Sequence, residues 1–462
     1  MAPFCKAWRG YMNTLGDFFA VLSAAEERLD QGFANLPPAS RPALDAQAEA
    51  ILQQVAVRLH DNYPYGHPLY AGQMLKPPHP IARAAYALAM SLNPNNHARD
   101  GGRASSGMEI EAVAVLARML GLPQHLGHLT SGGTFANLEA LWVAGQSAAG
   151  GSIAASDQAH YTHSRISAVL GLPFTSIPSD HAGRMDLRAL ESELASGKIG
   201  TVVATLGTTA TGAVDPLHEI VELRRRYGFR IHADAAYGGY FALASNLAGE
   251  TRAAFDAIPQ VDSIVVDPHK HGLQPYGCGA ILFRDPAVGR FYKHDSPYTY
   301  FSSKDLHLGE ISLECSRAGA SAVALWATQQ LLPYTQGGEF ARGLEAGRAA
   351  ALEMYRRLAA DQRFITPMAL PELDIIYWAV RAGSPQSSSA LARRVFEEAA
   401  QRDLHLALAE LPLRFFSPAV WQQTDSDTVT CLRSVLMKAD HLPWIDEIWK
   451  RLNDATARVV CP

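Results

Sequence analysis

The chain has 462 residues, a formal net charge of −5, and a composition that is 48% hydrophobic and 18% charged. This is typical of a soluble globular protein with enough apolar material for a large core, so we expect one large domain and a smaller one. The charge is small and no cluster of lysine and arginine stands out, which argues against a nucleic-acid partner.

The cysteines argue for a reducing, cytoplasmic location. They are five in number, widely spaced and without a CxxC pair, so we expect neither a disulfide framework nor a metal site. The N-terminus lacks the pattern of an export signal, and no later stretch stays apolar long enough to span a bilayer. We therefore expect no membrane association.

Residues 1–60 are predicted to form an N-terminal helical arm. After the breaker Leu36-Pro37-Pro38, apolar residues recur at helical spacing through 43–59, as at Ile51, Val55 and Leu59. Such an arm has little core of its own. We expect it to pack on another surface, for which a second subunit is a candidate.

Residues 61–335 are predicted to form a large α/β domain. Helices are expected over 108–120 and after Gly133, and apolar or β-branched runs predict strands at 201–206, 230–233 and 263–266. Strands separated by helices imply a mostly parallel sheet with helices on both faces. Ligands in such sheets bind at the carboxyl ends of the strands.

Residues 336–462 are predicted to form a small C-terminal α+β domain. A linking helix is expected after Gly337-Gly338, because these glycines follow Pro333 and interrupt the preceding helical pattern. Apolar runs at 375–380 and 429–437 then predict strands.

The first chemical signal is Asp234, which ends an apolar run that begins at Ile231. This position places a carboxylate at the ligand-binding edge of the sheet, where the small Ala235 and Ala236 would let a flat ring approach. A buried carboxylate is costly unless a cation or hydrogen-bond donors pair with it. On this run alone, an Asp234 that merely caps a helix remains the alternative.

The second signal is Lys270, which lies just beyond the apolar run 264–266. Lysine is rarely drawn to the end of a core strand without cause, although a solvated loop lysine is the ordinary alternative. A pyridine cofactor needs an amine to bind its aldehyde and a carboxylate to keep its ring nitrogen protonated. Lys270 and Asp234 would supply both from successive strands, which predicts pyridoxal 5′-phosphate (PLP) as the cofactor.

A phosphate-binding turn is predicted at Gly132-Gly133-Thr134. Two glycines let backbone N–H groups approach an anion, Ser131 or Thr134 adds a hydroxyl, and the following helix presents its N-terminus. Glycine-rich helix starts are common, so this turn supports a PLP site only together with Lys270 and Asp234.

Taken together, these runs resemble the PLP-dependent amino-acid decarboxylases of fold-type I, the group II enzymes that include glutamate, aromatic-amino-acid and bacterial tyrosine decarboxylases. The similarity extends over roughly residues 60–335 and rests on Asp-Ala-Ala-Tyr-Gly at 234–238 and Pro-His-Lys at 268–270. It implies a fold-type I structure, a small-molecule L-amino acid as substrate, and a homodimer with shared active sites.

The resemblance implies a role for each residue around the cofactor's ring. Lys270 matches the lysine that binds the cofactor covalently, and Asp234 matches the partner of the ring nitrogen. Ala236 matches the small residue on one face of the ring, and His160 matches the histidine stacked on the other face. Thr209 resembles a threonine near the ring oxygen. From the residues alone, an ordinary core position for His160 and a turn-stabilising role for Thr209 remain open.

The resemblance also assigns the phosphate site and the substrate's α-carboxylate. Gly133 and Thr134 match the phosphate-binding turn, which Asp267 and His269 would complete. Arg317 resembles the arginine near the α-carboxylate, although an ion pair with its neighbour on the chain, Glu314, is the alternative. The implied catalytic residues are Lys270, His160, Asp234 and Arg317.

The substrate pocket and the proton donor are less well defined by the sequence. The resemblance implies pocket residues at Tyr70, Gln73, His271, Tyr298 and Tyr300. A tyrosine on a loop before Arg317 donates the proton in the aromatic decarboxylases, but neither Tyr298 nor Tyr300 aligns with it, so His160 and His271 are further candidates.

Several substrates and reactions remain compatible with these residues. An aromatic L-amino acid is favoured over an acidic one, because no second arginine can be assigned to a side-chain carboxylate. Aldehyde formation by a PLP-dependent aldehyde synthase, transamination, and cofactor binding without turnover are the alternatives to decarboxylation.

Overall fold

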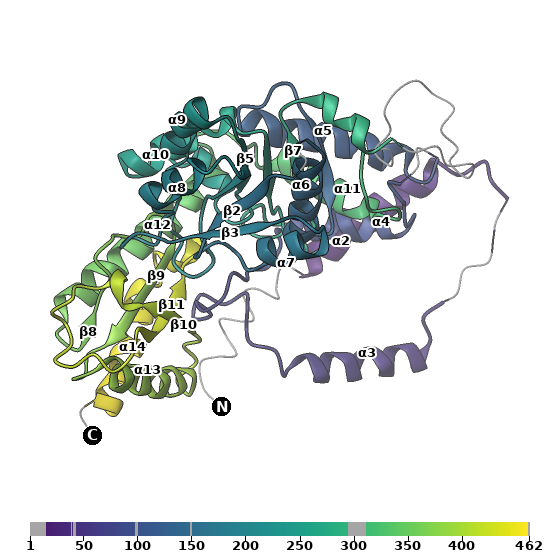
Figure 1. Ribbon diagram of the computed structural model, residues 1–462. Helices are drawn as coiled ribbons and strands as arrows, with labels where there is room; N and C mark the ends of the chain where they lie inside the picture. Colours follow the sequence, from purple (N-terminus) through teal and green to yellow (C-terminus); the bar gives the residue numbers. More distant parts are fainter. Residues whose placement is uncertain are drawn as a thin grey trace.

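The computed structural model describes residues 15–37, 39, 43–97, 100–147, 150–293 and 311–460. Figure 1 shows a large sheet with its helices beside a smaller C-terminal sheet. Among the described residues, no helix is both long and apolar enough to cross a membrane. Within them, Cys278, Cys315 and Cys431 are free thiols.

The large sheet has seven strands, and six of them run in the same direction, with β7 as the exception. The strands are β1 (Leu126–Thr130), β2 (Ser152–Ser156), β3 (Phe174–Ile177), β4 (Ile199–Thr205), β5 (Arg230–Asp234), β6 (Ser263–Val266) and β7 (Gly279–Phe283). Their order is β1-β7-β6-β5-β4-β2-β3. The pairs from β3 to β6 are parallel, whereas β7 runs antiparallel to both β6 and β1. The predicted mostly parallel sheet is confirmed.

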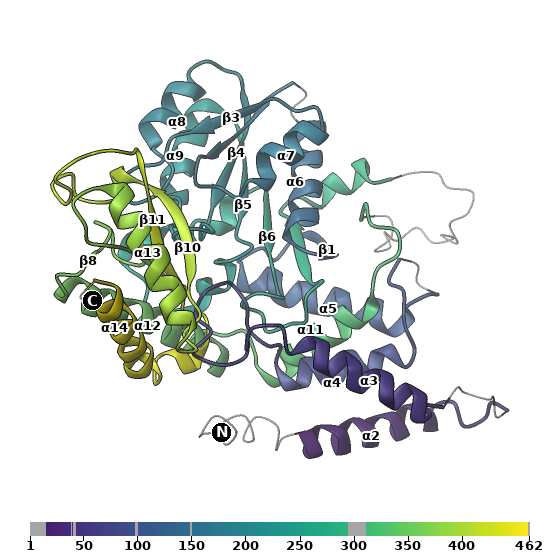
Figure 2. The same ribbon diagram turned by 90° about the horizontal axis from the view of Figure 1, so that it is seen from below.

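Helices cover both faces of this sheet. The helices of this part of the chain are α4 (Pro80–Met90), α5 (Arg103–Met119), α6 (Gly133–Ser147), α7 (Thr162–Val169), α8 (Leu187–Leu194), α9 (Leu217–Tyr227), α10 (Gly249–Asp256) and α11 (Gly319–Leu331). Figures 1 and 2 show α8 and α9 on one side of the central strands and α6 and α7 on the other.

The strands are buried because alternate side chains fill two separate cores. On β6, Ile264 and Val266 pack into the core that includes α5, α8 and α9. Val265 points the other way and packs with Ala136 and Ala140 of α6. Since successive side chains of a strand point to opposite faces, a fully buried strand such as β6 requires cover on both sides.

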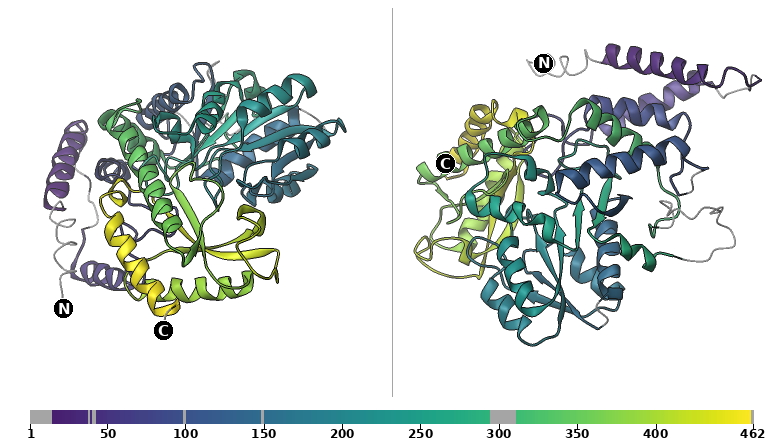
Figure 3. Two further views of the ribbon diagram at one scale, coloured as in Figure 1. Left: turned by 90° about the vertical axis from the view of Figure 1, so that its left-hand side faces the viewer. Right: turned by 90° about the horizontal axis from the view of Figure 1, so that it is seen from above.

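The small sheet is antiparallel and belongs to the C-terminal part of the chain. Its strands are β8 (Phe364–Ile365), β9 (Ile375–Val380), β10 (Ala407–Pro412) and β11 (Thr428–Val435). Across the sheet they are arranged in the order β10-β11-β9-β8. Its helices are α12 (Glu339–Ala360), α13 (Pro385–Ala400) and α14 (Ile445–Val460). Figure 3 shows this yellow and green part beside the large sheet. Helix α12 is the expected linking helix, whereas the predicted domain boundaries stay a prediction.

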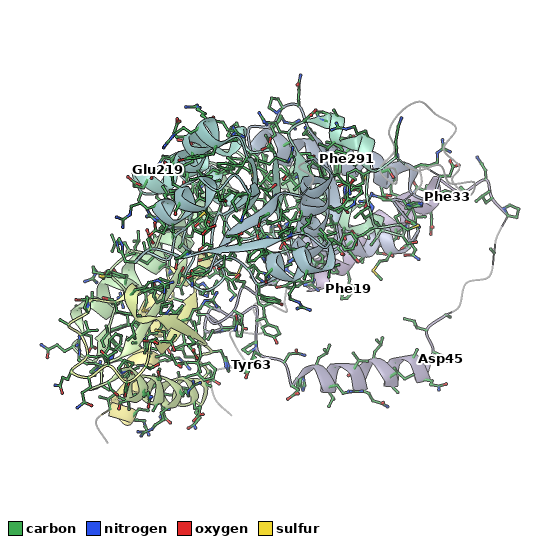
Figure 4. The ribbon with its side chains drawn as sticks, viewed as in Figure 1. Phe19, Phe33, Asp45, Tyr63, Glu219 and Phe291 are labelled. Atoms are coloured by element: carbon green, nitrogen blue, oxygen red, sulfur yellow. The ribbon has the colours of Figure 1, made fainter. Side chains whose placement is uncertain are left out.

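The N-terminal region contains two helices that differ in their contacts. Helix α2 (Leu15–Gln31) packs on α4, where the Arg83 guanidinium lies 5.1 Å from the centre of the Phe18 ring. Helix α3 (Ala46–Leu59) buries none of its residues. Figure 4 shows α3 beginning beside Asp45 and standing clear of both sheets.

Candidate active site

The carboxyl ends of the parallel strands bring the predicted cofactor residues together. Thr205, Asp234 and Val265 are paired across the ends of β4, β5 and β6. A cavity of about 390 Å³ lies at this edge. It is lined by all nine of the predicted cofactor residues: Gly133, Thr134, His160, Thr209, Asp234, Ala236, Asp267, His269 and Lys270.

Lys270 lies in this cavity beside a buried carboxylate. Its Nζ is 3.1 Å from Oδ2 of Asp267, and Nε2 of His269 is 3.6 Å from the same oxygen. The backbone N–H of Lys270 donates to the carbonyl of Asp267, so a tight turn after β6 sets the position of the lysine. The ion pair holds the amine at the cavity wall while its side chain stays partly exposed.

Asp234 is held by three hydrogen bonds. Oδ2 accepts from Nε2 of His163 at 2.8 Å and from Nδ2 of Asn137 at 3.3 Å, and Oδ1 accepts from the backbone N–H of Ala236 at 3.2 Å. Burial alone would raise the pKa of Asp234. The hydrogen bond and charge interaction with His163, together with the nearby Lys270, outweigh burial and hold its pKa below the ordinary value. Asp234 is therefore an ionised, oriented carboxylate.

Asn137 is itself oriented by a buried histidine. Its Oδ1 lies 2.7 Å from Nε2 of His232, whose Nδ1 lies 2.9 Å from Oγ of Ser263. Burial lowers the pKa of His232 to about 3, so its ring is neutral. With Nε2–H donating to Oδ1, the amide NH₂ of Asn137 must point toward Asp234.

His160 lies at the cavity with one ring nitrogen already bound. The backbone N–H of Thr162 donates to Nδ1 at 3.3 Å, and the Thr162 hydroxyl contacts the same nitrogen. Burial, with a smaller effect from Lys270 and His163, lowers the pKa of His160. The neutral ring therefore carries its proton on Nε2.

The predicted phosphate turn lies at the N-terminus of α6. Gly133 begins this helix, and a Cβ at this position would meet Oδ2 of Asp267 at 2.7 Å. Gly132 has a φ of +153°, which side chains rarely adopt. Free N–H groups and the helix dipole favour an anion here. Asp267 can contribute no hydrogen bond to a phosphate while ionised, and it pairs with Lys270 instead.

Arg317 does not lie at the cavity. Its guanidinium pairs with Oε1 of Glu109 at 2.7 Å and donates to the carbonyl of Leu129 at 2.6 Å, and the side chain is buried. Glu314, the alternative partner, accepts instead from the backbone N–H of Ser131. These contacts give Arg317 a structural ion pair and do not support the predicted role at the α-carboxylate.

Three of the five predicted pocket residues lie away from this cavity. Tyr70 is 4% exposed and Gln73 is exposed, and neither lines the cavity. His271 faces a second cavity, because the turn after Lys270 points successive side chains in different directions. Tyr298 and Tyr300 lie outside the described residues.

Three residues that the sequence analysis missed contact or flank the site. Asn137 lies one helical turn after Gly133, and His163 lies one turn after His160, so helical spacing from each predicted residue is a signal that could have found them. Arg433 of β11 donates to the carbonyl of Thr209 at 2.5 Å. It comes from the other sheet, and no local pattern connects it with the site.

The residues present fit PLP. The cavity falls within the usual size range of small-ligand sites, roughly 300–1,000 Å³. Lys270 supplies the amine, Asp234 supplies an ionised partner for a protonated ring nitrogen, and α6 supplies an anion-binding N-terminus.

Comparison with known proteins gives the same assignment. The family model described as "Pyridoxal-dependent decarboxylase conserved domain" matches residues 35–375. The chain belongs to this family of pyridoxal-dependent decarboxylases. This decarboxylase is thus a PLP-dependent enzyme that acts on an amino acid, as the sequence predicted.

Two curated relatives and one solved structure illustrate the similarity of this decarboxylase to known proteins. A probable L-tyrosine/L-aspartate decarboxylase of Methanothermobacter thermautotrophicus is 31% identical over 259 residues, which cover 55% of this chain and 69% of the relative. The L-tyrosine decarboxylase of Enterococcus faecium is 28% identical over 417 residues, which cover 67% of this chain and 68% of the relative. The crystal structure of mouse CSAD superimposes with a TM-score of 0.77 at 21% identity, and the match covers 97% of this chain and 98% of the mouse protein. The predicted fold-type I architecture is confirmed.

Proposed function

We propose that this decarboxylase converts an aromatic L-amino acid, with tyrosine as the favoured substrate, to its amine and carbon dioxide. The observation that carries this proposal is the charge of the cavity wall. Among the described lining residues, the positive or protonatable side chains are Lys270, His160 and His269, and no arginine is present. A side-chain carboxylate would have no dedicated cation there, which favours an uncharged side chain.

The experiment that tests this proposal is incubation of the purified holoenzyme with single L-amino acids and detection of amines by mass spectrometry. We expect tyramine from L-tyrosine at a kcat/KM at least tenfold above that for L-aspartate, L-glutamate or L-2,4-diaminobutyrate. Faster conversion of an acidic amino acid would overturn the aromatic assignment. Hydrogen peroxide or an oxo-acid as the main product would instead indicate aldehyde formation or transamination.

We infer that Arg433 is the cation nearest to the substrate's α-carboxylate. Its side chain is buried, and its described hydrogen bonds go to the carbonyls of Ala210, Thr209 and Gly72 and to the side-chain oxygen of Gln73. No carboxylate lies within ion-pair distance among the described residues. A buried guanidinium without a counter-ion beside a cavity residue suits a carboxylate ligand.

Substitution of the two arginines would separate their roles. We expect Arg433→Gln to raise KM roughly tenfold or more, the effect of one lost ion pair of about 1.5–3 kcal/mol. Arg317→Gln leaves the buried Glu109 carboxylate without its cation, so we expect a loss of roughly 3–5 kcal/mol in the free energy of unfolding. Steady-state kinetics measure KM, and denaturant unfolding measures the free energy of unfolding. The inference fails if Arg317→Gln raises KM and Arg433→Gln does not.

The protein's own groups would act in sequence around the bound cofactor. PLP, when bound, supplies a ring that accepts the electron pair left by departing carbon dioxide. Lys270 holds and releases the cofactor, and Asp234 maintains the proton on the ring nitrogen. A site that keeps the α-carboxylate upright over the ring and poorly solvated favours decarboxylation over other bond cleavages. His160, with its proton on Nε2, is a candidate donor to the reacting carbon.

We also propose a homodimer in which α3 packs on a second subunit. The exposed fractions of Ile51, Leu52, Val55 and Leu59 are 51%, 57%, 45% and 59%, which leaves an apolar helix face uncovered. Burial of one such side chain contributes roughly 1.5–3 kcal/mol. An apolar helix face of this kind supports contact with another chain.

Charge on the exposed face of α3 is expected to dissociate the dimer. The double substitution Ile51→Glu and Val55→Glu should lower the mass measured by light scattering toward that of a monomer at micromolar concentration. Gln53→Glu adds charge on the same helix away from this face and serves as the matched control. Parent protein that is monomeric and active would contradict the homodimer, and a doubly substituted protein that stays dimeric would contradict the role of α3.

A further inference from the structure

A second cavity, which we call the junction cavity, lies next to the turn that carries Lys270. Its volume is about 440 Å³. Four segments distant in sequence form its wall, namely parts of 66–79, 271–273, 332–344 and 437–440. It therefore lies where the large sheet's loops meet the start of α12 and the chain just after β11. The predicted cofactor site uses none of its residues.

Two lysines line the junction cavity without a carboxylate partner. Nζ of Lys438 donates to the carbonyl of Tyr70 at 2.6 Å, and Nζ of Lys76 donates to the carbonyl of Met437 at 3.2 Å. No ion pair joins either ammonium to an acidic side chain in the described part of the chain. Each ammonium has three N–H donors, so one carbonyl leaves most of its capacity unused.

The acidic groups nearby form no ion pair with either lysine among the described residues and offset these charges only in part. Asp374 is the buried carboxylate closest to His271, and its Oδ1 already accepts the hydrogen bond of the Tyr237 hydroxyl at 2.5 Å. Glu339 and Asp440 line the cavity but are exposed. Burial lowers the pKa of Lys438 to about 7 and that of Lys76 to about 8, and it outweighs the attraction of Asp440 for Lys438 and of Asp374 for Lys76.

His271 adds an unused polar group to the same wall. Its side chain is 1% exposed, and neither ring nitrogen has a hydrogen-bond partner among the described residues. Nε2 lies 3.3 Å from Oδ2 of Asp374, but the two are not aligned for a hydrogen bond. Buried polar groups are nearly always hydrogen-bonded, so an unpaired ring at a cavity points to a missing ligand.

We propose that the junction cavity binds a small oxyanion, of the phosphate or dicarboxylate class, between Lys76, Lys438 and His271. The oxygens of such an anion accept hydrogen bonds from the two ammonium groups and from the imidazole. The anion also offsets buried positive charge that the chain itself leaves uncompensated.

This site is connected to the cofactor cavity. His271 directly follows Lys270, and Asp374 faces His271 on one side and binds Tyr237 on the other. Tyr237 lines the cofactor cavity. An anion at the junction cavity therefore alters the electrostatic environment of Tyr237 and Lys270 without entering the cofactor site.

Calorimetric titration of the holoenzyme with inorganic phosphate tests the proposal, and a second titration with malonate tells phosphate from a dicarboxylate. We expect saturable binding of at least one of them at constant ionic strength set with sodium chloride. Lys438→Met and Lys76→Met should each weaken that binding tenfold or more. Lys450→Met removes an exposed lysine of α14 and should leave it unchanged. The absorption spectrum of the cofactor is followed in parallel. An unchanged spectrum shows that the cofactor still occupies its site, so the added anion binds elsewhere.

Two results would overturn the proposal. One is the absence of saturable binding of both anions to the holoenzyme. The other is binding that Lys76→Met leaves as tight as in the parent. Among the described residues, Lys76 donates to one backbone carbonyl, so Lys76→Met still tests the proposal if Lys438→Met fails to fold. None of these measurements depends on which amino acid the enzyme decarboxylates.

Discussion

Replacement of Lys270 by alanine is expected to abolish covalent cofactor binding and catalysis together. The variant lacks the amine that lies in the cavity 3.1 Å from Asp267, and no other lysine lines the cavity among the described residues. We expect turnover to fall by more than roughly 10⁴-fold, beyond the range for loss of an acid–base group alone. The visible absorption band of lysine-bound cofactor should disappear after dialysis.

The matched control for this experiment is Lys198→Ala, which removes an exposed lysine in the same domain. It should keep both the absorption band and the activity. Circular dichroism and unfolding curves show whether each variant folds. A Lys270→Ala protein that keeps the band after dialysis would exclude Lys270 as the cofactor lysine.

Replacement of Asp234 by asparagine is expected to leave the cofactor bound but nearly inactive. The amide has almost the same shape, yet it carries no negative charge and cannot maintain a proton on the ring nitrogen. By analogy with the loss of one preorganised electrostatic group, we expect kcat to fall on the order of 10²- to 10³-fold. The measurements are kcat, the cofactor's dissociation constant and its absorption spectrum.

The control for Asp234→Asn is Asp256→Asn, because the Asp256 side chain is 67% exposed and pairs only at the surface with Arg252. That variant should behave like the parent protein. Unchanged kinetics in Asp234→Asn would remove Asp234 from its proposed role. An unfolded variant would be distinguished by its circular dichroism, and Asp234→Glu then tests whether charge alone suffices.

The sequence predicted the large sheet and the cofactor residues well because their signals are local. Apolar strands that end in a charged residue are visible in the chain itself, and Asp234 and Lys270 each follow such a run. The parallel arrangement then places both at one edge of the sheet. The antiparallel β7 between β1 and β6 was not predicted, since strand order depends on contacts distant in sequence.

The environment of the substrate could not be predicted in the same way. Arg317 follows a family pattern, but its charge is compensated by Glu109, which lies 208 positions away in the sequence. Arg433 reaches Thr209 from a different sheet, and no periodicity in either segment indicates the contact. Ion pairs between distant elements depend on the folded arrangement, so residue type alone did not separate these two arginines.

The hydrogen bonds that run from Ser263 through His232 and Asn137 to Asp234 also bear on how the cofactor enters. The neutral His232 fixes the orientation of Asn137, and His163 keeps Asp234 ionised, so the carboxylate is charged and oriented without a bound ring. We therefore expect capture of the cofactor to need no reorientation of these groups. In the apoenzyme, the Asp234 carboxylate is thus already oriented to pair with a protonated ring nitrogen.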